Sequence, residues 1–425
     1  MGIRLGAIAD DFTGATDLAN NLVRAGMRVV QLMEVPEDGA EAVAPDADAV
    51  VIALKSRTVP AAEAVAASLR ALAWLRNAGA EQIYFKYCST FDSTPAGNIG
   101  PVAEALMDAL GTGFTVATPA FPDNGRTVFK GHLFVDDVLL SESGMRNHPL
   151  TPMTDSNLVS VLGAQTTRPV GLIDHTVLAA GADAVRTRIA ELRSAGVAFA
   201  VVDAVSNDDL LRLGEAVREL PLVTAGSGLA IGLPANWGIQ PSTAAAELPP
   251  AGGYRAIVSG SVSTATNGQV RAFLDSGRPA FSVDPLRIAA GEDVAGAALA
   301  FADAHLADGP VLVHSTEAPD AVRGVQSRLG AAEAGELVER TLAEVARGLV
   351  ARGVGRLVVA GGETSGAVVQ ALGITGLRIG PQIDPGVPWC AAVLPDGGTL
   401  HLTLKSGNFG SPDFFTAAFA LLDAS

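Results

Sequence analysis

The stretch Ile8-Ala-Asp-Asp-Phe-Thr-Gly-Ala-Thr-Asp17 stands where an apolar run gives way to a helical pattern. Gly2–Ile8 predicts a buried strand, and the spacing of apolar residues over Gly14–Ala25 predicts a helix. Two carboxylates, a hydroxyl and a glycine therefore follow a strand, where open α/β sheets bind their ligands. A single acid would suffice to cap the helix. The second acid, next to Thr13, favours a binding site.

The composition indicates a globular α/β protein with two domains. The chain has 425 residues, more than one hydrophobic core usually holds. A formal net charge of −16 argues against nucleic acid as a partner. No apolar run approaches the ~18 residues of a membrane span and no signal-peptide pattern is present, so we expect a cytoplasmic protein without a membrane partner. The 2 cysteines and 6 histidines lack metal-ligand spacing, so we expect no metal held by side chains alone.

Strand and helix patterns alternate in both halves, which predicts two largely parallel sheets flanked by helices. We expect an N-terminal domain over residues 1–236, a proline-rich linker over 237–252 and a C-terminal domain over 253–425. The active site is expected in the cleft between these domains. The segment 123–152 is long and polar, and we expect a loop there that either binds a ligand or forms a surface or dimer arm.

Polar residues that follow strands in the first half point to a site for a small polyhydroxy anion. Because the carboxyl ends of parallel strands meet at one edge, we expect these residues to gather there. Cationic side chains would hold a carboxylate, and acids and hydroxyls would hold hydroxyl groups. The candidates are Lys55, Arg57, Lys86 and Arg126 for the carboxylate, and Asp10, Asp11, Thr13, Ser89, Thr90 and Asp92 for the hydroxyls.

Three loops rich in glycine and hydroxyls follow expected strands in the second half, at residues 259–263, 361–366 and 405–410. Such loops free backbone N–H groups to bind phosphate oxygens. Lys405 could add a point charge on a phosphate. None of the loops matches the phosphate-loop or dinucleotide fingerprint, which makes a dehydrogenase a poor interpretation. A phosphate domain joined to an acid-binding domain suggests phosphoryl transfer, which depends on positioning and charge neutralisation.

These motifs together resemble the four-carbon acid sugar kinase family over nearly the whole chain. The opening stretch is similar to the family's sugar-acid-binding domain. Ala360-Gly-Gly-Glu-Thr-Ser365 and Lys405-Ser-Gly-Asn-Phe-Gly410 are similar to its nucleotide-binding domain. The oxo-acid subfamily is the best match, because the run Lys86–Thr94 is longer than the Lys-Lys-x-Asp-Ser-Thr run of the threonate and erythronate kinases. The supporting stretches are Phe85–Thr94, Gly97–Pro101, Leu139–Met145 and Gln382–Trp389.

The resemblance implies ATP-dependent phosphorylation of the 4-hydroxyl of 3-oxo-tetronate in the catabolism of four-carbon sugar acids. It implies ATP and Mg²⁺ as cofactors, with the sugar acid and ATP as partners and a homodimer as an open alternative for the assembly. The implied ATP contacts are Ser259, Ser261, Gly361, Gly362, Glu363, Thr364 and Gly407. We expect Asp11, ahead of Asp10, to accept the proton of the hydroxyl, and Lys405 to take up developing charge.

Two other functions stay open from the sequence. The kinase could act on D-threonate, D-erythronate or another hydroxy acid. Alternatively, the chain could be a nucleotide-regulated binding protein without catalysis, in which the same residues only contact ligands.

Overall fold

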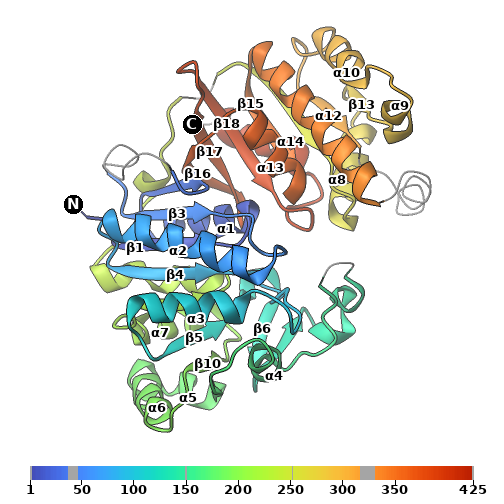
Figure 1. The fold of residues 1–425 in the computed structure, drawn as a ribbon. Coiled ribbons are helices and arrows are strands. Elements are labelled where there is room, and N and C mark those ends of the chain that lie inside the picture. The colour runs from blue at the N-terminus through green and yellow to red at the C-terminus, as the bar shows by residue number, and fades with distance from the viewer. Residues whose placement is uncertain (1, 37–45, 149–150, 251, 316–330, 424–425) are drawn as a thin grey trace. The chain divides into compact units, whose positions relative to one another are not determined.

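The computed structural model describes residues 2–36, 46–148, 151–250, 252–315 and 331–423. The chain divides into two compact units, Met1–Ala246 and Glu247–Ser425. Each unit contains a largely parallel run of hydrogen-bonded strands, called its sheet below, flanked by helices (Figure 1), which confirms the predicted α/β fold class. The unit boundary falls inside the stretch 237–252, of which residue 251 lies outside the described residues.

The sheet of the first unit has the strand order β2-β3-β1-β4-β11-β5-β10-β9, and every neighbouring pair is parallel. The strands are short apolar runs without alternation, as expected where helices cover both faces of a sheet. Their bounds are β1 Leu5–Ala9, β2 Val29–Met33, β3 Ala49–Ala53, β4 Gln82–Lys86, β5 Thr115–Thr118, β9 Val170–Ile173, β10 Phe199–Val202 and β11 Leu222–Ala225.

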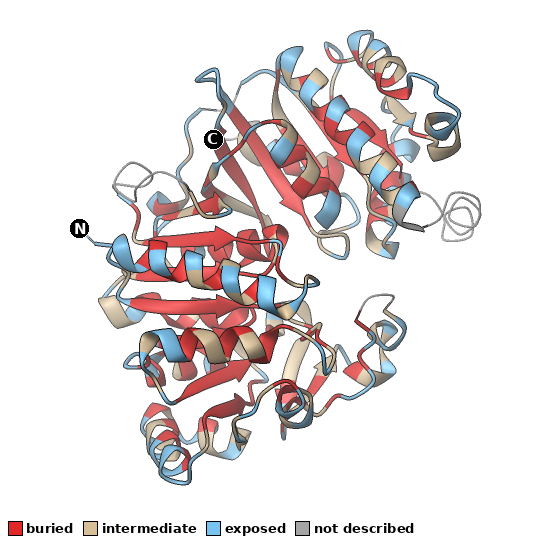
Figure 2. Cartoon of the chain, viewed as in Figure 1, coloured by how far each residue is buried: buried red, intermediate tan, exposed pale blue. Residues whose placement is uncertain are grey.

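Helices of the first unit lie on both sides of this sheet, with α2 and α3 in front of it in Figure 1. Helix α1 is buried along nearly its whole length, whereas α2 exposes one side to solvent (Figure 2). The bounds are α1 Phe12–Arg24, α2 Ala61–Asn77, α3 Ile99–Leu110, α4 Leu158–Gly163, α5 His175–Ala179, α6 Ala182–Ser194 and α7 Asn207–Ala216. Short 3₁₀ helices are η2 Pro122–Asn124, η3 Leu140–Glu142, η4 Gly144–Asn147, η5 Gly228–Gly232, η6 Pro234–Trp237 and η7 Thr243–Ala246.

The segment 123–152 is not the loop that the sequence predicted. Strands β6 Arg126–Phe129, β7 His132–Val135 and β8 Val138–Leu139 form a separate antiparallel sheet. Two-residue turns join them, and Lys130, Gly131 and Asp136 have positive φ in these turns. The turns carry Lys-Gly and Asp-Asp rather than the Asn-Gly that signals a hairpin, so the pattern was easy to miss. Residues 149 and 150 of this segment lie outside the described residues.

The sheet of the second unit has the strand order β13-β14-β12-β15-β18-β17-β16. The first five strands are parallel, and β17 pairs antiparallel with both β18 and β16. The hairpin β16–β17, which the sequence analysis did not predict, turns at Pro385-Gly386, where Gly386 has a φ of 76°. The bounds are β12 Tyr254–Ser259, β13 Ala280–Ser282, β14 Val311–His314, β15 Val354–Ala360, β16 Gly376–Asp384, β17 Val387–Val393 and β18 Thr399–Lys405.

A single apolar cluster binds helices α8 and α14 to the sheet of the second unit. Phe273 of α8 and Phe414, Phe415 and Phe419 of α14 pack with Trp389 of β17 in this cluster. Among the helices that the structure describes, none has both the length and the apolar character needed to cross a bilayer. The helix bounds are α8 Thr264–Asp275, α9 Pro285–Ala289, α10 Val294–Asp303, α12 Ala331–Ala351, α13 Gly362–Ala371 and α14 Phe414–Asp423.

Candidate active site

Charged side chains at the ends of three neighbouring strands, β3, β1 and β4, meet at one edge of the first sheet. We call this group the acid cluster; its members are Asp10, Asp11, Arg57, Lys86 and Asp92. The parallel register explains the gathering, because Ala9, Ala53 and Lys86 are aligned across the three strands. The sequence-based expectation that these side chains lie together agrees with this geometry.

Arg57 links the carboxylates of the acid cluster. Its Nε and Nη2 donate to the two carboxylate oxygens of Asp10, both at 2.8 Å, and Nη2 also donates to Asp11 Oδ1 at 2.7 Å. Its Nη1 lies 3.9 Å from Asp92 Oδ2. Burial acts to lower the pKa of Arg57, but Asp10 and Asp11 outweigh it and raise that pKa well above its ordinary value. The guanidinium is thus fixed in place by several charge-assisted contacts.

Asp11 is both the N-cap of α1 and the centre of the acid cluster. Its carboxylate accepts hydrogen bonds from Gly14 N at 3.1 Å and from Thr13 Oγ1 at 2.9 Å, and Lys86 Nζ lies 3.4 Å from Oδ1. Burial acts to raise the pKa of Asp11, yet Arg57 and Lys86 hold it well below its usual range. Asp11 is therefore ionised at any pH at which an enzyme works.

The acid cluster contains three carboxylates and two cations, which leaves it one net negative charge. Such a site suits the hydroxyl groups of a ligand better than its carboxylate. The cavity beside Asp10, Arg57 and Asp92 measures only about 10 Å³, room for about one water. This cavity is therefore too small to enclose a sugar acid.

The Asn98 side chain and the packing of Phe91 hold the loops of the acid cluster. Asn98, the N-cap of α3, donates through Nδ2 to the carbonyls of Ser56, Arg57 and Val59, at 2.7, 3.2 and 2.9 Å. Phe91 has a φ of 53°, which is costly for a residue with a side chain. Its ring is fully buried and packs edge-on against another aromatic ring, with the centroids 5.2 Å apart. Packing thus fixes the turn that carries Asp92.

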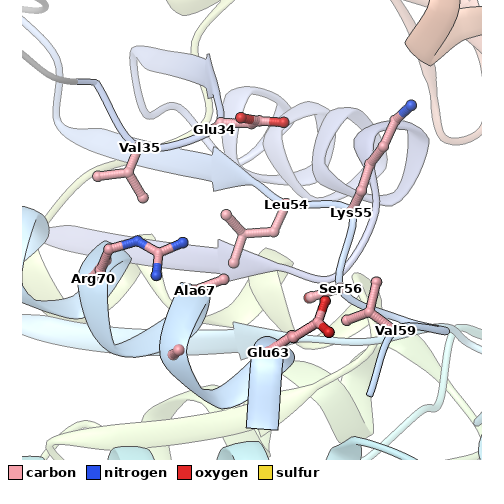
Figure 3. A pocket seen from close by; sticks show the side chains of 10 residues that line it. Glu34, Val35, Leu54, Lys55, Ser56, Val59, Glu63, Ala67 and Arg70 are labelled. Carbon is pink, nitrogen blue, oxygen red and sulfur yellow. The ribbon is translucent and has the colours of Figure 1, made fainter. Parts of the chain in front are cut away.

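The remaining predicted residues of the first unit fall into two groups. Thr90 donates to Asp92 and belongs with the acid cluster, and Ser89 is half-buried in the same turn. Lys55 is exposed, with Nζ 5.5 Å from the centroid of the Phe12 ring. Lys55 lines a cavity of about 420 Å³ between the end of β3 and α2, and its ammonium points away from Arg70 on the other side (Figure 3). Within the described part of the chain, no hydrogen bond or ion pair joins Lys55 to the acid cluster.

Arg126 lies at the start of β6 and donates to the carbonyl of Asn124. Its Nε is buried and makes no hydrogen bond to the described residues. Its charge also acts on Asp17 of α1, a buried carboxylate that accepts a hydrogen bond from Ser227 Oγ. Asp17 and Asn98 could not be recognised as site residues from the sequence, because neither a single carboxylate within a helix nor a single amide forms a sequence motif.

The three glycine loops of the second unit also meet at one sheet edge, because they follow the adjacent strands β12, β15 and β18. They touch closely: a Cβ on Gly260 would lie 2.2 Å from Thr364 Oγ1, and one on Gly407 would lie 2.5 Å from Ser261 Oγ. Only glycine permits this approach. Ser259 is fully buried at the end of β12. The predicted residues of these loops are therefore gathered in one place.

Two helices begin at these loops. Ser263 caps α8 by accepting a hydrogen bond from Thr266 N. Helix α13 begins at Gly362, after Gly361 with a φ of 122°, so most of the stretch 361–366, which the sequence analysis expects as a loop, is the first part of this helix. Glu363 and Thr364 are consequently part of its first turn. The N–H groups of a helix start favour an anion, so both helices suit a phosphate site.

The sequence predicts that the Lys405 ammonium contacts a phosphate, whereas in the structure the ammonium faces the carbonyls of the loop that follows β18. It is fully buried, and Nζ donates to Thr266 Oγ1 at 3.0 Å and to the carbonyls of Ser406, Gly407 and Phe409 at 3.0, 3.2 and 3.0 Å. Burial lowers its pKa to about 7. An ammonium has three N–H groups, and four oxygens of the protein surround them. Its contacts therefore favour a role in holding the loop.

Comparisons with known proteins match both units. Residues 5–233 match the family model of a sugar-binding N-terminal domain, and residues 256–415 match that of a nucleotide-binding C-terminal domain. The chain is 60% identical over 422 residues to 3-oxo-tetronate kinase of Cupriavidus necator, covering 98% of this chain and 97% of that one. It is 61% identical to 3-oxo-tetronate kinase of Pseudomonas fluorescens, with the same coverage. The chain belongs to the four-carbon acid sugar kinase family.

Solved structures agree with this membership. A structure from Salmonella typhimurium LT2 has a TM-score of 0.87 at 47% identity and covers 98% of both chains. One from Haemophilus influenzae has a TM-score of 0.80 at 45% identity, covering 98% of this chain and 100% of that one. In this four-carbon acid sugar kinase, the acid cluster lies within the part matched to the sugar-binding domain, and the glycine loops lie within the part matched to the nucleotide-binding domain.

Proposed function

We propose that this protein is an ATP-dependent kinase that phosphorylates the 4-hydroxyl of 3-oxo-tetronate, giving 3-oxo-tetronate 4-phosphate in the catabolism of four-carbon sugar acids. The observation that carries the proposal is near full-length identity of 58–61% to relatives that are 3-oxo-tetronate kinases. The acid cluster and the glycine loops supply the two kinds of site that this reaction requires.

The acid cluster would orient the acceptor. Asp11 accepts a hydrogen bond from the 4-hydroxyl and takes its proton as the oxygen bonds to the γ-phosphorus, while the bond from that phosphorus to the β-phosphate oxygen breaks and ADP leaves with the electron pair. Asp11 is ionised and so able to accept this proton, and in phosphoryl transfer positioning of the nucleophile contributes more than the strength of the base. Asp10, through Arg57, keeps Asp11 in place.

The acid cluster as a whole is negative, so the acceptor's carboxylate needs cations with few contacts to acids, one inside the cluster and one beside it. Arg126 has a buried Nε without a hydrogen bond to the described residues, and Lys86 has one ion-pair contact, to Asp11. We propose that these two side chains hold the acceptor carboxylate, and that Thr13, Ser89, Thr90 and Asp92 contact hydroxyl or keto oxygens. In this proposal Lys55 contributes only an exposed positive charge near this edge of the sheet.

The glycine loops would hold ATP through Ser259, Ser261, Gly361, Gly362, Glu363, Thr364 and Gly407. Among the described residues, no cluster of three or more His, Cys, Asp or Glu side chains is arranged to hold a metal. Glu363 and the hydroxyl of Thr364 at the start of α13 fit Mg²⁺ bound mainly through phosphate oxygens, the usual arrangement for this ion. When bound, Mg²⁺ would neutralise charge on the phosphates. A cytoplasmic location and a homodimer remain predictions.

The deciding experiment is an ADP-release assay with ATP, Mg²⁺ and a panel of four-carbon acids. We expect saturable turnover with 3-oxo-tetronate and at least about tenfold lower kcat/KM with D-threonate and D-erythronate. Saturable activity with a non-oxidised acid and none with the oxo acid would replace the acceptor in this proposal. Absence of turnover with every acid, together with intact ATP binding, would favour a regulated binding protein.

The role of Asp11 is tested by Asp11→Asn, which retains the capping oxygen of the side chain. We expect kcat to fall by about 10²–10⁴ and the Kd for ATP to stay unchanged. Asp174→Asn is a matched control, because Asp174 caps α5 in the same unit and pairs with Lys130. That variant should keep wild-type turnover. An unchanged kcat in Asp11→Asn would remove Asp11 from the mechanism.

A further inference from the structure

Four side chains hold the carbonyl oxygens of the loop that follows β18. Lys405 Nζ donates to the carbonyls of Ser406, Gly407 and Phe409. Gln269 Nε2, from α8, donates to the carbonyls of Phe409, Gly410 and Ser411 at 3.1, 2.9 and 3.0 Å. The hydroxyls of Ser263 and Thr266 both donate to Gly407 O. The carbonyls of residues 406, 407, 409, 410 and 411 therefore all face these four side chains.

This arrangement determines where the N–H groups of the loop point. In a trans peptide the N–H and the C=O point in opposite directions, so the amides of Gly407, Asn408 and Gly410 face away from Lys405 and Gln269. No hydrogen bond to these three amides occurs within the described residues. Ser411 N is the exception, because it donates to Asp384 Oδ2 at 2.7 Å. Phe409 N donates to Ser406 O at 3.1 Å, so the free amides are the adjacent pair Gly407 and Asn408 and, beyond Phe409, Gly410. Successive free amides in a turn are suited to bind an anion.

Burying Lys405 and Gln269 in this arrangement costs free energy of folding, which argues that the arrangement has a function. Lys405 is fully buried and no carboxylate pairs with it among the described residues, and Gln269 is 1% exposed with Oε1 unpartnered. Burying an ammonium and an incompletely bonded amide costs free energy that an apolar side chain would avoid. Both residues direct their donors at the same loop, and Gly407 of that loop lies against Ser261 of another glycine loop.

We propose that Lys405 and Gln269 are positioning residues that hold residues 406–411 in the conformation whose amides bind the phosphates of ATP. This rests on the proposed function of the second unit. It gives Lys405 a different role from a direct phosphate contact. Direct contact would make Lys405 alone important, whereas positioning requires the uncharged Gln269 to matter for the same ligand.

The test is Gln269→Leu, which removes the two N–H groups that three carbonyls share, without changing charge. We expect the Kd for ATP, measured by calorimetry without the acceptor, and the KM for ATP to rise about tenfold or more, because several phosphate contacts weaken together. The KM for the acceptor acid should stay within about twofold. Lys405→Met should change the ATP constants in the same direction.

Gln82→Leu is the matched control. Gln82 is equally buried and donates to the carbonyls of Val217 and Leu220, but it lies in the first unit. It should lower the melting temperature without altering the Kd for ATP. This comparison separates loss of stability from loss of the phosphate-binding conformation.

Wild-type ATP affinity in a folded Gln269→Leu protein would overturn the positioning role. If that variant does not fold, Thr266→Val decides, because it is isosteric and removes the donation to Gly407 O and the acceptor for Lys405. Unchanged ATP affinity in Thr266→Val would then overturn the proposal. Failure of the wild-type protein to bind ATP would instead refute the proposed function, which keeps the two outcomes distinct.

Discussion

Gly14 is the residue that gives Lys86 its position. A Cβ at residue 14 would lie 1.7 Å from Lys86 Nζ and 2.2 Å from Asp11 Oδ1. Gly14 is in the first turn of α1, where its φ is ordinary, so backbone freedom does not explain the glycine. The absence of a side chain lets the Lys86 ammonium reach Asp11 directly above the helix start. The Thr-Gly of the opening stretch is thus part of the site's electrostatics.

We expect Gly14→Ala to damage activity while leaving the fold intact. The added methyl group displaces Lys86 Nζ, and kcat/KM for the sugar acid should fall about tenfold or more. Alanine favours a helix over glycine by about 1 kcal/mol, so the thermal stability should change little. Steady-state kinetics and thermal unfolding measure both. Gly163→Ala, in α4 with open space around the added Cβ, should be silent, and an equally silent Gly14→Ala would contradict the argument.

Asp17 is a buried carboxylate that the opening stretch also contains. It is 5% exposed, accepts a hydrogen bond from Ser227, and its Oδ1 has no partner among the described residues. Burial raises its pKa to about 6, although Lys86 and the hydrogen bond from Ser227 act in the opposite direction. The charged form of Asp17 is therefore less stable in the folded state than in water.

Asp17→Asn should change how stability depends on pH. Because the folded pKa lies above the unfolded value of 3.8, the stabilising contribution of Asp17 is present below pH 3.8 and is lost as pH rises through 6. The loss amounts to about 3 kcal/mol. Asparagine does not titrate, so the variant should gain stability relative to wild type between pH 4.5 and 7.5. Urea unfolding at both pH values measures this, and a difference that does not vary with pH would refute it.

At the scale of elements, both sheets carry their functional loops in the same way. A buried side-chain amide from a segment distant in sequence holds the carbonyls of a loop: Asn98, the N-cap of α3, holds residues 56–59, and Gln269 of α8 holds residues 409–411. Loops at a sheet edge cannot form ladder hydrogen bonds, so side chains must satisfy their backbone. These side-chain amides hold a short loop in one conformation. The loop then positions Arg57 in the first unit and free backbone N–H groups in the second.

We expect Asn98→Ala to weaken binding of the sugar acid selectively. Loss of the two N–H groups that three carbonyls share should lower the free energy of unfolding by about 1–3 kcal/mol and let Arg57 move relative to Asp10. The KM for the acid should rise about tenfold, while the KM for ATP stays constant. Asn236→Ala removes a comparable donation, to Gly214 O, away from the acid cluster and should alter stability alone. A rise in both KM values would indicate general unfolding instead.

At the scale of the whole molecule, the two units separate two kinds of ligand chemistry. The first gathers carboxylates and cations at its sheet edge, and the second gathers glycines and hydroxyls. The chain as a whole carries a formal net charge of −16, so each anionic ligand must be bound by local groups against the overall field. The same sheet-edge arrangement thus gathers two different sets of groups within one chain, and we expect each set to bind its own ligand.

Hydrogen–deuterium exchange can test, in the intact protein, whether the two units bind different ligands. A non-hydrolysable ATP analogue should protect residues 259–263, 361–366 and 406–410, because bound phosphates engage their amides. The sugar acid should protect residues 10–14, 55–57 and 86–92 instead. Protection of the first set by the acid alone, or of the second set by the analogue alone, would contradict the assignment.

Many elements were predictable because their signals are local. The strand expected over Gly2–Ile8 is β1 Leu5–Ala9, and the helix expected over Gly14–Ala25 is α1 Phe12–Arg24, so both lie within a few residues of the predicted bounds. Helix α7 was overlooked although Ser206 and Asp209 form a capping box, a signal present in the sequence. The hairpin β16–β17 also had a signal in Pro385-Gly386. These omissions reflect overlooked turn and cap chemistry.

What the sequence by itself determined is the fold class, the gathering of polar residues at strand ends and the family. These depend on the periodicity of apolar residues, on the register of parallel strands and on long motifs, all of which can be recognised from the order of residues in the chain. Only the tertiary structure decided which way Lys405 points, which carbonyls Asn98 and Gln269 hold, and that Gly14 makes room for Lys86. Each of these depends on atoms from segments far apart in sequence, whose distances arise only when the sheets form and the helices pack.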